Sequence, residues 1–192
     1  HVMAEAFRIA QTGRCGPVLI DVPKDAQLQE VEFDAWPEVT PAPPDYGMDP
    51  DLAGEIARMI NDAHRPLIYA GGGIPAAGAA ASLRRLVHKN SIPVMVTLMG
   101  LGTMSPDDPF YLGMVGMHGA PYTNYVLDEI DLLITLGARF DDRAIGKVKE
   151  FCPSASIIHI DIDASEIDKI KRCRISAVAD VADLNRVVVA SD

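Results

Sequence analysis

Residues 137–143 read Gly-Ala-Arg-Phe-Asp-Asp-Arg, so two arginines and two carboxylates directly follow a short apolar run. A guanidinium group offers forked donors that suit a pyrophosphate, and a carboxylate suits the hydroxyls of a ribose. A solvated helix cap would need far fewer charges than this segment carries. We therefore expect residues 137–143 to bind a ligand, with a surface cap as the alternative.

Three consecutive glycines, Gly71, Gly72 and Gly73, follow another apolar run. Glycine lets a backbone approach a pyrophosphate closely, and amides at a following helix N-terminus can bind its charge. The spacing does not match the G-x-G-x-x-G pattern of dinucleotide sites, and no acidic residue follows a strand about 20 residues later. At this point a dinucleotide site and an ordinary tight turn both remain open.

The histidines and methionines carry weaker signals. His118 has no nearby Ser or Cys nucleophile pattern and no second histidine at metal spacing, so we expect no catalytic role for it. His159 stands inside an apolar run, which favours a hydrogen-bonded core residue. Five methionines are expected to fill the core, or alternatively to form an adaptable apolar wall against a flat ring: Met95, Met99, Met104, Met114 and Met117.

The composition sets the class of protein. With 192 residues, 48% of them hydrophobic and 23% charged, the chain can bury one good core and carry an appendage. Its net charge of -10 disfavours nucleic-acid and anionic-membrane partners, so an anionic ligand must meet locally placed arginines. Three cysteines without metal-type spacing disfavour a disulfide framework or a zinc site. We expect no membrane span, and a cytoplasmic location or an organelle interior.

Short apolar runs separated by helical patterns position these residues. Nearly continuous hydrophobicity in such runs is typical of a parallel sheet that is covered on both faces. We therefore predict a doubly wound, Rossmann-like α/β domain over residues 49–190, with ligands beyond the carboxyl ends of the strands, where the glycines and arginines stand. The predicted strands are residues 66–70, 93–97, 131–136, 156–161 and 175–179.

The first quarter of the chain differs in sequence pattern from the rest. Helical spacing of apolar residues predicts a helix over residues 2–11, and a β-branched run predicts a buried strand over residues 18–22. Five prolines between residues 25 and 50 indicate a linker. The helix and strand make no domain of their own, and we expect the chain to be cut at both ends.

Four segments together carry a family resemblance. They are residues 16–25 (GPVLIDVPKD), 97–102 (TLMGLG), 112–119 (LGMVGMHG) and 137–143 (GARFDDR), with residues 159–163 (HIDID) as a fifth. In this order they closely resemble the catalytic large subunit of acetolactate (acetohydroxyacid) synthase. The resemblance implies a central FAD-binding domain of a thiamine-diphosphate-dependent enzyme.

The same resemblance implies the division of the chain and its site residues. Residues 1–25 would be the end of the pyrimidine-binding domain, residues 26–48 a Pro-rich linker, and residues 49–190 the central FAD-binding domain. The implied substrate channel contains Lys24, Met117, Asp142 and Arg143. The implied FAD-binding residues are Arg14, Gly71, Gly72, Gly73, Thr97, Leu98, Met99, Gly116, Met117, His118, Gly137, Ala138, Arg139, Asp141, Arg143, Asp161, Ile162, Asp180 and Val181. Cys15 departs from the family pattern, in which a proline usually follows the arginine, and this bears on the pose of Arg14.

For the whole subunit, the resemblance implies condensation of pyruvate with a second pyruvate or with 2-oxobutanoate, with loss of CO2, in branched-chain amino-acid biosynthesis. Thiamine diphosphate and Mg2+ would serve the full-length enzyme, and FAD would be mainly structural. The implied partners are the remaining domains of the subunit, a homodimer or homotetramer, and a regulatory subunit. The family's catalytic glutamate and its Gly-Asp-Gly motif belong to the other domains, so we expect no catalysis by this chain alone. Glyoxylate carboligase, pyruvate oxidase and a non-catalytic nucleotide-binding module remain alternatives.

Overall fold

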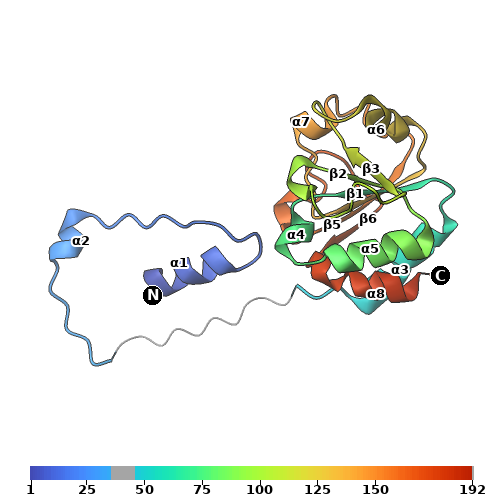
Figure 1. The fold of residues 1–192 in the computed structure, drawn as a ribbon. Coiled ribbons are helices and arrows are strands. Elements are labelled where there is room, and N and C mark those ends of the chain that lie inside the picture. Colours follow the sequence, from blue (N-terminus) through green and yellow to red (C-terminus); the bar gives the residue numbers. More distant parts are fainter. Residues whose placement is uncertain (36–45, 192) are drawn as a thin grey trace. The chain divides into compact units, whose positions relative to one another are not determined.

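The structure, a computed structural model, describes residues 1–35 and 46–191 and divides the chain into two compact units (Figure 1). The first unit comprises residues 1–45 and the second residues 46–192. Residues 36–45 of the predicted linker, residues 26–48, lie outside the described residues, and the boundaries of the linker stay a prediction. Met48, at the end of that segment, is buried in the core of the second unit.

The first unit contains two helices, α1 (Val2–Gln11) and α2 (Lys24–Leu28). The helix predicted over residues 2–11 is confirmed. The strand predicted over residues 18–22 is wrong, because this segment has no regular structure and Leu19 is 93% exposed. A strand forms only where a neighbour accepts its ladder hydrogen bonds, and residues 1–35 contain no second extended segment paired with it.

The second unit is built on a six-stranded parallel sheet in the order β3-β2-β1-β4-β5-β6. The predicted doubly wound α/β fold is confirmed. One strand was missed: β3 contains Gly113 and its residues are only half-buried, so it shows no continuous apolar run. The strands are β1 (Pro66–Ala70), β2 (Val94–Val96), β3 (Tyr111–Met114), β4 (Leu132–Leu136), β5 (Ser156–Asp161) and β6 (Ile175–Val178).

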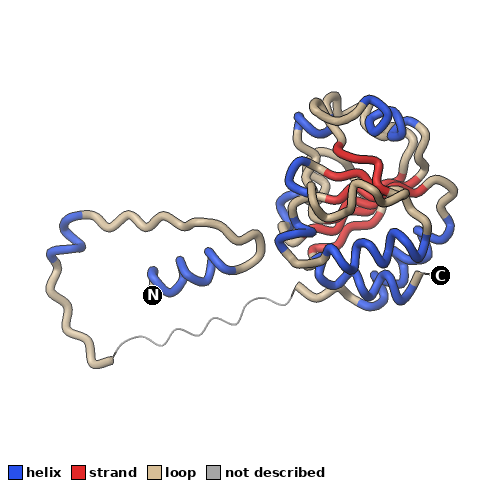
Figure 2. Tube along the Cα trace, viewed as in Figure 1, coloured by secondary structure: helices blue, strands red, loops and turns tan. Residues whose placement is uncertain are grey.

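Three helices cover one face of the sheet (Figure 2). They are α3 (Pro50–Asp62), α5 (Ala80–Asn90) and α8 (Leu184–Ala190). Helix α3 begins at Asp49, whose carboxylate accepts hydrogen bonds from the backbone N–H groups of Asp51 and Leu52. The apolar core under these helices includes Ile56 and Leu83, both fully buried.

Shorter elements cover the opposite face. Helices α6 (Pro121–Tyr125) and α7 (Asp142–Ile145) lie there with connecting loops (Figure 1). Tyr69, Phe140 and Phe151 form an aromatic cluster on this side, with ring centroids 6.0 to 6.3 Å apart. The remaining short elements are α4 (Gly73–Ala76), η1 (Leu98–Gly100), η2 (Val126–Asp128), η3 (Ala164–Glu166) and η4 (Val181–Asp183). No helix in the described part of the chain is long and apolar enough to span a membrane.

Candidate ligand-binding site

The strand order reverses between β1 and β4. From β1 the chain continues to β2 and β3 on one side, and from β4 to β5 and β6 on the other. The last residues of the two strands, Ala70 and Leu136, are level with each other. Ligands of open α/β sheets bind in the crevice beyond such a reversal. The glycine run after β1 and the Arg139 loop (residues 137–140) after β4 both stand at this point.

These two loops pack backbone against backbone. A Cβ atom at Gly71 would lie 2.3 Å from the carbonyl oxygen of Gly137, and one at Gly73 would lie 2.7 Å from the Cα of Gly137. The N–H of Gly73 donates to that same carbonyl over 2.9 Å. The sequence alone links these glycines either to close approach of a ligand or to a tight turn. The structure gives a different reason, because any side chain at Gly71 or Gly73 would push the two loops apart.

Several backbone amides at this edge are free to bind a ligand. Among the described residues, the N–H groups of Gly72, Leu98 and Arg139 have no acceptor. Thr97 shapes the turn that carries Leu98, because its side-chain oxygen accepts from the N–H of Gly100 over 3.2 Å. Unpaired amides at neighbouring strand ends favour an anion such as a phosphate.

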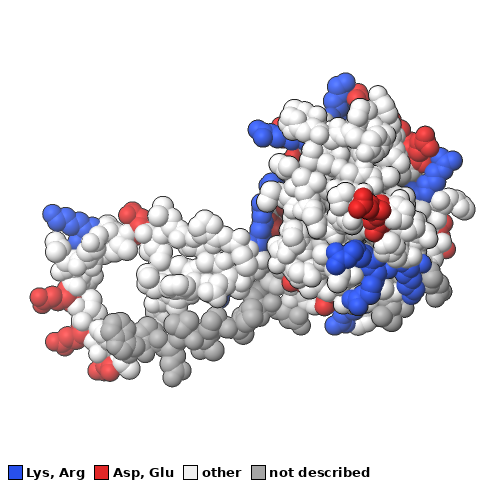
Figure 3. All heavy atoms as spheres, viewed as in Figure 1, with Lys and Arg blue, Asp and Glu red and all other residues white. Residues whose placement is uncertain are grey.

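The arginines at positions 139 and 143 differ from the cations that lie over α5 and α8. Figure 3 shows Lys and Arg side chains gathered over α5 and α8, where Arg85 binds Asn185 and Lys89 binds the carbonyl of Val188. Arg139 and Arg143 are exposed, and within the described residues their guanidinium groups have no hydrogen bond or ion pair.

The carboxylates beside these arginines do not neutralise them. Asp141 instead accepts from the backbone N–H groups of Arg143 and Ala144, over 3.1 Å each, and so caps α7. Asp142 is exposed. The surface cap that the sequence left as the alternative is thus present at Asp141. Arg139 pairs with neither neighbouring carboxylate among the described residues, so it remains available to a ligand.

The loop of residues 116–118 is joined to the same region. The N–H of Met117 donates to the carbonyl of Arg143 over 2.9 Å, and Gly116 has a φ of 101°, which favours glycine. Asn124 holds this loop in place: its side-chain oxygen accepts from the N–H of Gly116 over 2.9 Å and its amide donates back to the Gly116 carbonyl over 3.2 Å. Met117 and His118 are exposed. Sequence reasoning missed Asn124, since nothing in its neighbourhood indicated which backbone groups it would reach.

Strands β5 and β6 bring further predicted residues to this edge. Asp161 is the last residue of β5 and only 8% exposed, and its burial raises the pKa of its carboxyl group. The carboxylate accepts from the N–H of Asp163 over 2.9 Å. Asp180 caps η4, which contains the buried Val181 and packs against α4. Ile162 is half-buried beside them in sequence.

Two buried side chains hold the Arg139 loop from below. The Tyr69 hydroxyl donates to the carbonyl of Arg139 over 3.1 Å, and Nε2 of His159 donates to the carbonyl of Ala138 over 3.0 Å. The prediction of a hydrogen-bonded core histidine is confirmed at Nε2, whereas Nδ1 has no partner. Burial raises the pKa of Tyr69 and lowers the pKa of His159, so both groups are neutral donors.

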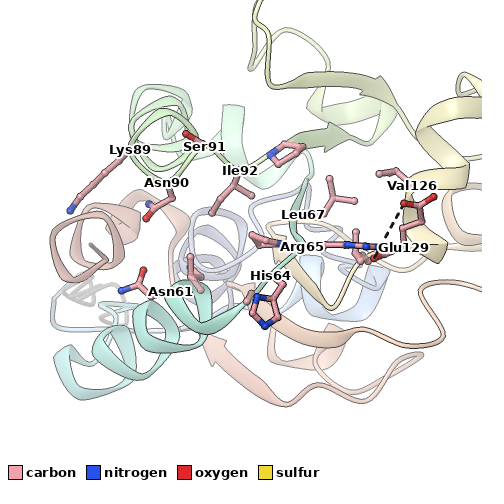
Figure 4. Close-up of a pocket in the computed structure, with 15 residues that line it drawn as sticks. Asn61, His64, Arg65, Leu67, Lys89, Asn90, Ser91, Ile92, Val126 and Glu129 are labelled. Carbon is pink, nitrogen blue, oxygen red and sulfur yellow. Dashed lines mark hydrogen bonds and ion pairs between the residues drawn. The ribbon is translucent and has the colours of Figure 1, made fainter.

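A cavity of about 810 Å³ opens at the opposite edge of the sheet, beside the amino ends of β1, β2 and β4 (Figure 4). His64, Arg65 and Lys89 contribute to its lining, and Arg65 pairs with Glu129 at 3.8 Å. The predicted ligand residues do not line this cavity. Because Arg65 and Lys89 line this cavity, it offers cationic side chains whose substitution can serve as a control for substitutions at the carboxyl edge of the sheet.

Two predicted site residues, Arg14 and Lys24, belong to the first unit. Both are exposed. Their part in the site stays a prediction.

Comparison with known proteins decides the family. The profile described as "Thiamine pyrophosphate enzyme, central domain" matches residues 53–188, which covers all six strands. The chain belongs to this family.

Members with curated names are similar over nearly the whole chain. The acetolactate synthase isozyme 1 large subunit of Escherichia coli is 49% identical over 96% of this chain. The probable acetolactate synthase 2, chloroplastic, of Oryza sativa is 47% identical over 94%, and the probable acetolactate synthase large subunit of Methanocaldococcus jannaschii is 45% identical over 97%. The chain spans 32%, 28% and 32% of the lengths of these three proteins.

Proposed function

We propose that this chain is the central domain of an acetolactate synthase large subunit and that the carboxyl edge of its sheet binds FAD. The observation that carries the proposal is the strand-order reversal at β1 and β4, where unpaired amides and the unpaired Arg139 meet in an otherwise acidic chain. We infer the identity of the enzyme, acetolactate synthase, from the names of the similar proteins.

The residues present suit the parts of FAD. The N–H groups of Gly72 and Leu98, with the Arg139 guanidinium, would hold the pyrophosphate. The carboxylates at the ends of β5 and β6, Asp161 and Asp180, would accept from ribose hydroxyls. The exposed side chain of Met99 (72%) offers an adaptable apolar surface to a flat ring. Bound FAD would brace these loops, since condensation of two keto acids involves no net oxidation or reduction.

The rest of the proposal concerns the whole protein. The full subunit would decarboxylate pyruvate on thiamine diphosphate with Mg2+ and join the product to a second 2-keto acid, in branched-chain amino-acid biosynthesis. Thiamine diphosphate would supply the carbanion chemistry. We also propose association into a homodimer or homotetramer, a separate regulatory subunit, and a location in the cytoplasm or inside an organelle.

A flavin titration tests the site. The purified chain is mixed with FAD, excess is removed, and the bound flavin is measured by absorbance; affinity is then determined by fluorescence titration. We expect stoichiometric binding that Arg139→Ala weakens and Arg65→Ala leaves unchanged. Arg65 is the matched control, because it is an exposed arginine at the opposite edge of the same sheet. Equal losses in both variants, or binding lost only in Arg65→Ala, would place the flavin elsewhere.

A further inference from the structure

The Arg139 loop receives hydrogen bonds from two different strands at two consecutive carbonyl groups. Tyr69 belongs to β1 and His159 to β5, the two strands that flank β4. Tyr69 and Thr135 are in register across β1 and β4, and Thr135 and His159 across β4 and β5. The two donors therefore stand in one row of the sheet, on either side of the strand that leads into the loop.

The chemistry of both contacts is fixed by burial. A carbonyl oxygen only accepts, so Nε2 of His159 must carry the proton, and the lowered pKa of His159 keeps the ring neutral with Nδ1 as an acceptor. Both side chains are 0% exposed. Nδ1 has no partner among the described residues, which is a cost that an apolar side chain would avoid. What the imidazole contributes in return is the hydrogen bond to Ala138.

The same side chains also fix the residue after Arg139. Phe140 is buried, with its ring centroid 6.0 Å from that of Tyr69 and 5.3 Å from that of His159. The backbone before Arg139 is set by Gly137, which packs on the glycine run. Arg139 is thus the one exposed residue in the Arg139 loop, and because its guanidinium binds no described residue, the backbone sets the direction in which its side chain leaves the loop.

We propose that Tyr69 and His159 are positioning residues that hold the carbonyls of Ala138 and Arg139 and thereby direct the Arg139 side chain toward the ligand. This inference rests on the proposed flavin site. It assigns to two core residues a role in affinity that their burial alone does not imply.

The test uses variants that remove only the donor. Tyr69→Phe deletes the hydroxyl, and His159→Leu deletes the Nε2 donor, while His159→Gln retains an N–H donor at similar reach. Ile56→Val is the control, because it trims a fully buried side chain on the opposite face of the sheet. We expect Tyr69→Phe and His159→Leu each to raise the dissociation constant for FAD by about 5- to 10-fold. His159→Gln should restore most of the affinity, and Ile56→Val should leave it unchanged.

A double-mutant cycle separates positioning from general loosening. If Tyr69 acts through Arg139, Tyr69→Phe should change FAD affinity by less than about 2-fold in an Arg139→Ala background. A full 5- to 10-fold effect in that background, or losses in both donor variants no larger than in Ile56→Val, would overturn the proposal.

A third measurement keeps this inference apart from the flavin proposal. Trypsin cleavage after Arg139 in flavin-free protein requires Phe140 to leave the core, so its rate reports how firmly the loop is held. We expect faster cleavage in Tyr69→Phe and His159→Leu than in Ile56→Val. If the wild-type chain binds no FAD, the proposed function fails, and cleavage rates equal to that of the control would then show that the two donors do not hold the loop.

Discussion

The two faces of the sheet differ along the same strands. On the face covered by α3, α5 and α8, β1, β4 and β5 place the three apolar residues Ile68, Ile134 and Ile158 in one row. One position further along, on the opposite face, they place Tyr69, Thr135 and His159 in a row. The strands stabilise the first face through apolar burial, whereas on the second face Tyr69 and His159 also donate hydrogen bonds to the Arg139 loop at the carboxyl edge.

The largest effect should come from truncating the helix-covered face. Leu83 of α5 is fully buried there, so Leu83→Ala should lower the free energy of unfolding by about 2 to 5 kcal/mol. FAD affinity, measured under conditions in which the variant is folded, should stay within about 2-fold of wild type, because Leu83 is not among the predicted ligand residues. A tenfold change would require about 1.4 kcal/mol of binding free energy. Urea unfolding and flavin titration on the same preparation check both parts. A large loss of affinity would mean that the two faces are not separate in function.

The second-largest effect should be a loss of FAD affinity with almost no change in the stability of the fold. Arg139→Ala removes a charge-assisted hydrogen bond, worth roughly 1.5 to 3 kcal/mol, and should weaken FAD binding by about 10- to 150-fold. Thermal unfolding should be nearly unchanged, because Arg139 is exposed and has no partner in the described part of the protein. Unchanged affinity would show that the guanidinium does not reach the flavin.

A pH series tests the polar row. The pKa of His159 is lowered by burial from its ordinary 6.5, although the negative charges of Asp161, Glu166 and Asp168 oppose this shift. Below about pH 6.5 the unfolded chain binds a proton at this residue that the folded chain does not, so stability falls as the pH falls.

The expected slope is at most about 1.4 kcal/mol per pH unit, measured as the difference between wild type and His159→Gln. The raised pKa of Asp161 favours the folded state at lower pH in both proteins, so taking the difference reduces its contribution. A difference that is constant between pH 7.5 and 5.5 would contradict a neutral, buried His159.

The smallest effect separates two roles of Asp141. Its carboxylate caps α7, and Asp141→Ala should cost about 1 kcal/mol of stability. Asp141→Asn keeps the cap and removes the charge, so it should retain stability. Any loss of FAD affinity in Asp141→Asn would then report a contact with the cofactor, as the resemblance implies. If both variants lose the same stability, the charge matters more than the cap.

The fold was largely predictable because five strands of the central sheet are nearly continuous apolar runs. Strand β3 was missed, since Gly113 interrupts its pattern, and the run of residues 18–22 resembles those five without having a sheet to join. Local pattern therefore indicates that a segment can be a strand, and the presence of a partner decides whether it is.

The candidate site was predictable in part. The Arg139 loop and the glycine run follow strands, so parallel topology alone brings them to one edge. The sequence indicates that His159 is hydrogen-bonded in the core but does not indicate its target. It does not identify Tyr69, which stands inside an apolar run, or Asn124 as supports of the site. Their targets, the carbonyl of Arg139 and the backbone of Gly116, are fixed by tertiary packing, which spacing along the sequence does not encode.

The contact between the glycine run and Gly137 also has a consequence for folding. The strands that lead into these loops, β1 and β4, are neighbours in the sheet although α5, β2 and β3 lie between them in the chain. Closing so long an intervening segment costs chain entropy before the contact can form, so non-local pairing of this kind tends to be slow. The carboxyl edge with both loops forms only after both halves of the sheet have joined. The time at which flavin binding appears during refolding would therefore report when the domain has finished folding.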